Sequence, residues 1–158
     1  MIIPITHELQ MFSQIIGSIR TTVNRRSGTA DQKMGPQDGM QSDIDGVLAE
    51  LAFCKYFNVW PDLTIGGRRG SFDCMVDGKR VDVKSTRVAS GRLLATMKQT
   101  DDIDYYVLAI IGAKEINFPG YINFEDLRRE ENIVNLGWGN GYGVEQHQLT
   151  KFKCDGEQ

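Results

Sequence analysis

The chain has 158 residues, of which 41% are hydrophobic and 25% charged, and its formal net charge is −3. This length suits one domain with its own apolar core, and the composition excludes disordered and fibrous classes. No apolar run approaches the roughly 18 residues that a membrane span needs, and the first ten residues lack a signal-peptide pattern. We therefore expect a single domain over residues 1–158, no membrane partner, and a cytoplasmic location.

The basic side chains are concentrated in the middle of the sequence. Residues 62–98 carry eight Lys and Arg against four Asp and Glu, whereas residues 99–158 carry five against eleven. A local basic field favours a partner that bears phosphate groups. A solvated sheet edge protected by Lys and Arg explains the same pattern equally well.

The three cysteines, Cys54, Cys74 and Cys154, form no CxxC pair. An odd number without that spacing argues against a disulfide framework and against a zinc site. We therefore expect reduced thiols.

The N-terminal region predicts a helix followed by a loop. Apolar residues recur at spacings of three and four over residues 6–24, which is typical of an amphipathic helix: Leu9, Phe12, Ile15, Ile16, Ile19 and Val23. Residues 25–42 are rich in Gly and polar residues and predict a mobile loop. That loop either closes over a substrate or has no function of its own.

A second helix is expected over residues 42–57, opened by a capping box of Ser42 and Asp45. Between Gly46 and Cys54 every residue is Gly or apolar except Glu50. A carboxylate in so apolar a helix needs a Lys, an Arg or a metal ion nearby, unless it reaches solvent. Both an ordinary Arg partner and a functional role remain open for Glu50 at this point.

The rest of the chain predicts a sheet. We expect strands at 71–76 and 79–86, joined by Asp77-Gly78, which is a strong hairpin signal. Further strands are expected at 91–97, 104–111 and 120–123, the second of them central because it is almost entirely apolar. A short helix should follow over 124–130. The Gly-rich segment 137–143 lacks the spacing of a dinucleotide-binding loop.

The hairpin brings acidic residues together. A two-residue turn at Asp77-Gly78 places Asp73 opposite Asp82, and strand alternation places Lys84 on the same face. Val81 and Val83 then point to the core, as do Phe72, Cys74 and Val76 on the partner strand, and Ser71 faces Lys84. Opposed carboxylates are destabilising without a positive charge between them, so a divalent cation is a candidate. The alternative is an ordinary ion-pair ladder on an exposed face.

Mg²⁺ suits such a site because it prefers oxygen ligands and is usually held by one or two carboxylates together with phosphate oxygens. Lys84 would orient or deprotonate the attacking water, or balance the charge that develops on phosphorus. Glu50 would hold that water or complete a second metal site.

The ordered set of a helix Glu50, a strand Asp73, a tight turn and Asp82-Val83-Lys84 resembles the PD-(D/E)XK nuclease superfamily, in particular its small phage-encoded members. The match covers about residues 42–111, and Phe72 stands where the superfamily name has Pro. The resemblance implies an α/β (α+β) fold with a restriction-endonuclease-like core, a mixed central sheet flanked by helices. It also implies that Asp73, Asp82, Glu50 and the Val83 carbonyl hold the metal, and that Lys84 is the catalytic lysine.

The function implied by this resemblance is a Mg²⁺-dependent endonuclease of phage DNA metabolism, with Mn²⁺ as a substitute. Basic residues would contact the phosphates of DNA: Arg68, Arg69, Lys79, Arg80 and Arg87. The helix at 6–24 would form a homodimer interface or clamp the duplex. Two alternatives stay open, a non-catalytic nucleic-acid or protein-binding module on the same fold, and an RNA-directed nuclease.

Overall fold

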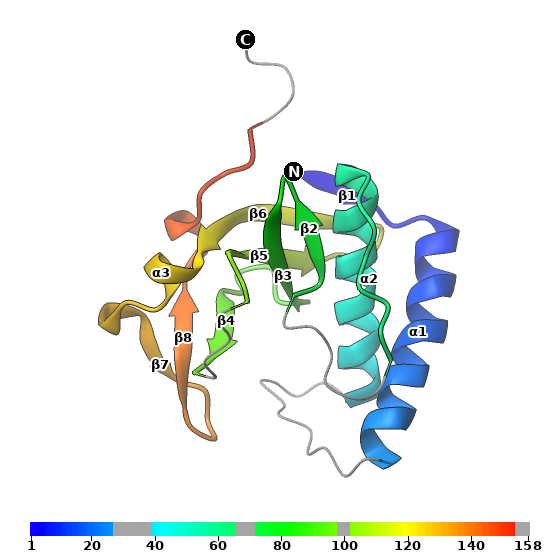
Figure 1. The fold of residues 1–158 in the computed structure, drawn as a ribbon, viewed down its shortest axis with the longest axis horizontal. Helices are drawn as coiled ribbons and strands as arrows, with labels where there is room; N and C mark the ends of the chain where they lie inside the picture. Colours follow the sequence, from blue (N-terminus) through cyan, green and yellow to red (C-terminus); the bar gives the residue numbers. More distant parts are fainter. Residues whose placement is uncertain (27–38, 66–71, 98–101, 154–158) are drawn as a thin grey trace.

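The fold was analysed in a computed structural model that describes residues 1–26, 39–65, 72–97 and 102–153. Figure 1 shows its elements. In chain order they are β1 (Ile2–Pro4), α1 (His7–Arg26), α2 (Gly39–Phe57), β2 (Cys74–Val76), β3 (Lys79–Thr86), β4 (Leu93–Thr96), β5 (Tyr105–Ile111), β6 (Glu115–Asn123), α3 (Phe124–Leu127), η1 (Glu130–Asn132), β7 (Ile133–Asn135), β8 (Asn140–Val144) and η2 (Gln146–Gln148).

The strands form two sheets. The larger one has five strands in the order β1-β6-β5-β3-β2, and the smaller one has three strands in the order β4-β8-β7. Strands β3 and β5 are parallel, while the other neighbouring strands in both sheets are antiparallel. The expected α+β class with a mixed central sheet and flanking helices is therefore confirmed. The expected central position of residues 104–111 is also confirmed, because β5 is the middle strand.

The large sheet is covered on both faces. On one face α2 packs against the odd-numbered side chains of β3 and β5, and α1 lies beside α2 (Figure 1). On the other face the even-numbered side chains of β5 pack with residues of β4, β8 and α3. A strand buried on both faces has an apolar side chain at nearly every position, which is why β5 has the sequence YYVLAII.

The β2–β3 hairpin has the predicted register. Cys74 pairs with Val81 and Val76 pairs with Lys79. Asp77 and Gly78 have φ angles of 50° and 75°, which is the backbone of a tight hairpin turn whose two central residues are left-handed. Val81 and Val83 are buried against α2, as expected.

Residue Phe72 lies on a different side of the sheet from the one predicted. It packs against the cluster that contains Leu93 and Tyr106, whereas Cys74 and Val76 pack in the cluster under α2. Strand β2 begins only at Cys74, so the simple alternation of side chains does not extend back to Phe72.

The predicted capping box at the start of α2 is wrong. The helix begins at Gly39, so Ser42 lies inside its first turn and cannot cap it. The Asp45 carboxylate is instead buried, and it accepts two hydrogen bonds of 2.6 Å from Arg87 and one of 2.7 Å from Gln41. Of the loop predicted at 25–42, both ends are helical, and residues 27–38 lie outside the described residues.

Helix α1 is confirmed, but three of the six residues of its apolar stripe, Phe12, Ile15 and Ile19, are exposed. Leu9 of the stripe is buried, and the other buried residues of α1 are Ser13, Gly17, Arg20 and Thr21. At Gly17 an added Cβ would lie 2.7 Å from the Cα of Ile44 in α2, so only glycine allows the two helices to cross this closely.

The remaining elements differ from expectation mainly in their extent. Strand β4 is shorter than the predicted 91–97, and β6 is longer than the predicted 120–123. The helix expected over 124–130 is one turn of α-helix followed by a 3₁₀ turn. The Gly-rich segment 137–143 connects β7 to β8 and supplies most of β8, which the sequence did not predict. Within the described ranges, no helix is both long and apolar enough to cross a membrane.

Candidate active site

Asp82 and Lys84 form the centre of the candidate site. They are two residues apart on β3 and therefore point to the same side of the strand, opposite to Val83. The Lys84 Nζ lies 2.7 Å from the Asp82 Oδ1, and the Asp82 side chain is only 11% exposed. Burial lowers the pKa of Lys84, but the attraction of Asp82 and Asp73 outweighs it, so the pKa lies above its usual value. Lys84 is therefore protonated at neutral pH, which favours charge balance over proton abstraction as its role.

Asp73 is tied to β3 by its main chain and its side chain. Its N–H donates to the Val81 carbonyl at 2.8 Å, and its Oδ2 accepts from the Val83 N–H at 2.7 Å. Asp73 lies one residue before β2. Its carboxylate therefore accepts the hydrogen bond from the Val83 N–H that a backbone carbonyl would accept in a continued strand. Burial raises its pKa well above the usual value, and the nearby carboxylates of Glu50 and Asp82 raise it further, against the opposing effect of Lys84.

Glu50 of α2 is buried, with 6% of its surface exposed. Arg20 of α1 donates to both of its oxygens from Nη1, at 3.0 and 2.8 Å. The basic partner expected for Glu50 is therefore confirmed. It is an Arg, which was one of the partners that the sequence analysis considered. A further role of Glu50 at a metal stays a prediction.

Arg20 also connects the helices to the hairpin. Its Nη2 donates to the Asp62 carbonyl at 3.0 Å, and the Asp62 N–H donates to the Asp73 carbonyl at 2.6 Å. Sequence reasoning missed Arg20 because it was assigned no face of α1. The available signal was its position three residues after Gly17, on the side that carries the small residues Ser13 and Thr21.

Among the described residues of this cluster, three are acidic and two are basic. Glu50, Asp73 and Asp82 supply the carboxylates, and Arg20 and Lys84 supply the cations. Burial is the main cause of the raised pKa of Asp73, and the nearby carboxylates of Glu50 and Asp82 add to it, because crowded carboxylates favour the protonated form. An oxygen-rich donor set with excess negative charge suits a hard divalent cation such as Mg²⁺.

The carboxylates are not arranged as a metal cluster ready to bind. Within the part of the chain that the structure describes, no three His, Cys, Asp or Glu side chains lie close enough together to hold a metal ion. Arg20 and Lys84 contact oxygens of Glu50 and Asp82, so a metal at this site would have to compete with them for these atoms. The predicted ligand role of the Val83 carbonyl remains a prediction.

The predicted phosphate-binding residues that the structure describes lie along β3 and directly after it. Lys79 is exposed at its first position, whereas Arg87 follows its last residue and is bound to Asp45. Arg80 contacts Asp104 from Nε at 3.1 Å and Asp102 from Nη1 at 3.3 Å. Arg80 and Arg87 thus each have acidic partners. Arg68, Arg69 and Ser71 lie outside the described residues.

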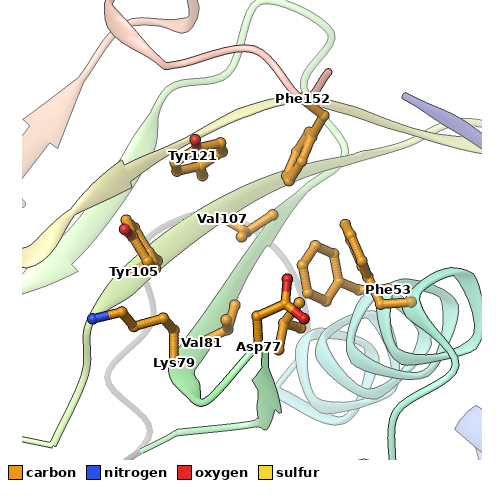
Figure 2. Close-up of a pocket in the computed structure, with 10 residues that line it drawn as sticks. Phe53, Asp77, Lys79, Val81, Tyr105, Val107, Tyr121 and Phe152 are labelled. Atoms are coloured by element: carbon orange, nitrogen blue, oxygen red, sulfur yellow. The ribbon is translucent and has the colours of Figure 1, made fainter. Parts of the chain in front are cut away.

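An open pocket of about 370 Å³ lies at the turn end of the hairpin (Figure 2). Asp77 and Lys79 lie at its rim. Its walls are largely aromatic and are formed by Phe53, Phe57, Tyr105, Tyr121 and Phe152. Its lining includes none of the four charged residues around Asp82, which are Arg20, Glu50, Asp73 and Lys84. The pocket is therefore separate from the candidate site.

The thiols of Cys54 and Cys74 lie next to the candidate site, and both are buried and not joined in a disulfide. The hydrogen bond that Cys54 donates to Cys74 raises the pKa of Cys54, and burial adds to this effect. Acceptance of the same bond lowers the pKa of Cys74. Cys154 lies outside the described residues.

No family model, no curated protein and no solved structure matches the chain.

Proposed function

We propose that the protein is a metal-dependent nuclease that hydrolyses phosphodiester bonds of DNA. The observation that supports this most is the meeting of Asp73, Asp82 and Lys84 at one end of the β2–β3 hairpin, with Glu50 of α2 beside them. This is the residue set that carries the resemblance to the PD-(D/E)XK superfamily. The proposal includes a restriction-endonuclease-like core and an endonuclease of phage DNA metabolism.

In this proposal Asp73 and Asp82 hold the metal, and Mg²⁺ or Mn²⁺ supplies positive charge next to the scissile phosphate. The fit rests on the carboxylates of Asp73, Asp82 and Glu50, which outnumber the cations among the described residues around them. Glu50 and the Val83 carbonyl are secondary candidates as ligands.

Lys84 acts as a protonated group in this scheme. Its ammonium group stabilises the negative charge that builds on the phosphate oxygens as water attacks in line and the 3′-oxygen leaves. Asp82 holds the Lys84 Nζ in place through their 2.7 Å contact. Arg20 holds the Glu50 carboxylate, and through Asp62 it also supports the main chain at Asp73.

DNA would be held mainly through its phosphates. Lys79 is exposed and available for such a contact, whereas Arg80 and Arg87 would have to exchange an acidic partner for a phosphate. Contacts of this kind predict weak sequence preference and an affinity that falls steeply with salt. A cytoplasmic location suits the two reduced buried thiols.

A second candidate function is a non-catalytic nucleic-acid or protein-binding module. It is favoured by the ion pairs of Glu50 with Arg20 and of Asp82 with Lys84, because these pairs satisfy the carboxylates without a metal. A site whose ligands are permanently paired would bind nucleic acid without cutting it.

Cleavage assays separate the two functions. We expect the wild type to cut linear, supercoiled, branched or single-stranded DNA with Mg²⁺ or Mn²⁺ and to be inactive with a chelator. Asp82→Asn and Lys84→Met should each lower the rate by about 100-fold or more. The exposed residues Lys114 and Glu125 provide matched controls, since Lys114→Met and Glu125→Gln remove the same charges away from the site. A parallel RNA panel tests the RNA-directed alternative.

The two outcomes are distinct. Metal-dependent cutting that both site variants lose, with circular dichroism spectra unchanged, supports the nuclease. Binding of DNA without cutting by the wild type, under every metal condition, rejects the nuclease and supports the binding module.

A further inference from the structure

The outer face of α1 exposes large apolar side chains in a continuous row. Phe12, Ile15 and Ile19 are 53%, 53% and 42% exposed, and Met11 beside them is 44% exposed. A row of this kind on one helix face is typical of a surface that binds another protein. It lies on the side of the helix opposite to Ser13, Gly17 and Arg20, which face α2 and the candidate site.

The row continues in both directions with a seven-residue repeat. The spacing alternates between four and three residues, which is the pattern of a helix that packs along one seam against another helix. All six positions are exposed: Glu8, Phe12, Ile15, Ile19, Thr22 and Arg26. The seam is about 27 Å long at 1.5 Å per residue. It is apolar in the middle, acidic at its first position and basic at its last.

This order of residues is complementary to itself when a second copy of the helix runs in the opposite direction. With a two-fold axis on the exposed side of the helix, at the level of residue 17 along it, Ile15 faces Ile19 of the other copy, Phe12 faces Thr22, and Glu8 faces Arg26. A two-fold interface repeats each contact, so both ends of the seam gain an acid–base pair. A parallel arrangement would instead place Glu8 against Glu8 and Arg26 against Arg26.

We propose that α1 binds α1 of a second copy of this chain in an antiparallel pair, with Ile15 and Ile19 at its centre and Glu8–Arg26 pairs at its ends. Charge complementarity selects the second copy as the occupant, because the same helix supplies both halves of each pair. Arg20 points away from this interface to Glu50, so the candidate sites of both copies remain free. The inference does not depend on the proposed nuclease activity.

Sedimentation measurements on the full chain test the pairing. The wild type should change from one to two chains in mass as its concentration rises to about 100 µM. Ile15→Glu should weaken association by at least 10-fold, because it places a carboxylate against the apolar centre. Gln14→Glu introduces the same charge on an exposed residue of α1 outside the seam and should leave association unchanged. A wild-type mass of one chain over the whole range overturns the proposal.

Charge exchange tests the direction of the pairing. Arg26→Glu and Glu8→Lys should each weaken association, since each places like charges together at both ends of the antiparallel seam. The double variant Glu8→Lys with Arg26→Glu restores opposite charges and should recover most of the wild-type association at low salt. If the single variants associate as the wild type does, or if the double variant does not recover, the antiparallel pairing is wrong. Circular dichroism of each variant confirms that α1 is still formed.

Discussion

Helix α2 carries two buried carboxylates, Asp45 near its start and Glu50 near its middle, and each is bound by an Arg from another element. Arg87 donates two hydrogen bonds to Asp45, but the Arg87 side chain is 45% exposed. Arg20, in contrast, is 3% exposed, so the pair with Glu50 is buried on both sides. The two pairs are alike in chemistry and differ in their surroundings.

That difference separates a structural ion pair from a candidate site. Asp45 and Arg87 balance each other, and Gln41 completes the hydrogen bonds of the carboxylate. Glu50 and Arg20 also pair with each other, but Asp73 and Asp82 lie close by with Lys84, so the described residues around Glu50 include one more carboxyl group than cation. A buried acid in an apolar helix is therefore weak support for catalysis, and unbalanced charge around it is stronger support.

Of the substitutions at these two ion pairs, loss of Arg20 should lower the free energy of unfolding most. Arg20→Met leaves the buried Glu50 carboxylate without its cation and should lower the free energy of unfolding by about 3–5 kcal/mol. Arg87→Met should cost less, about 1–3 kcal/mol, because Gln41 remains bound to Asp45. Urea denaturation of both variants measures the difference. Arg92→Met, which removes an exposed pair with Glu145, is the control and should cost under about 1 kcal/mol. Equal costs for Arg20→Met and Arg92→Met would contradict the burial argument.

Asp73→Asn should have a smaller effect and the opposite sign. The raised pKa means that the folded state holds the Asp73 proton more tightly than the unfolded state. The resulting stability is present at acidic pH and is lost as the pH rises through the folded-state pKa. At neutral pH in a chelator, Asn should therefore stabilise the protein by on the order of 1 kcal/mol, while its Oδ1 still accepts from Val83.

Metal ions make the same variant diagnostic. Mg²⁺ should raise the melting temperature of the wild type, because a ligand that binds only the folded state stabilises it. Asp73→Asn should lose this response, and Glu125→Gln should keep it. Thermal melts with and without Mg²⁺ measure both effects. A wild type that is unaffected by Mg²⁺ and by Mn²⁺ would argue for the binding module.

The smallest effect is expected at the partly exposed pair of Arg80 and Asp104. Hydrogen bonds from the Arg80 side chain and N–H lower the pKa of Asp104. Its contribution to stability is therefore present above the ordinary pKa of aspartate and is lost as the pH falls through the lowered value. Asp104→Asn should be slightly less stable than the wild type at neutral pH and equal to it in strong acid. Melts across this range check the convergence, and added salt should reduce the difference.

The parts of the fold that were predictable depend on near neighbours in the sequence. Asp77-Gly78 determines a two-residue turn, and that turn determines the register of Cys74–Val76 against Lys79–Val81. The apolar run at 105–111 identifies the central strand, since only a strand covered on both faces tolerates it. The pairing of Asp82 with Lys84 follows from the same alternation.

The parts that were missed depend on contacts between distant elements. Thirty residues separate Arg20 from Glu50, and neither residue type specifies the other. The apolar spacing on α1 predicted an amphipathic helix but not which residues pack against α2, and the buried residues include the small Ser13, Gly17 and Thr21. The start of α2 was predicted wrongly because Ser42 and Asp45 have the spacing of a capping box. In the folded chain the Asp45 carboxylate instead accepts hydrogen bonds from Arg87.

The close crossing at Gly17 links the position of α1 to the candidate site. The Ile44 backbone lies where a side chain at position 17 would begin, so a single methyl group there would force the two helices apart. Arg20 is fixed to α1 one turn further on, and its guanidinium reaches across the same gap to Glu50. The helix spacing that Gly17 permits therefore sets how far the Arg20 guanidinium extends. In this way Gly17, which has no side chain, determines where the positive charge next to Glu50 and Asp73 lies.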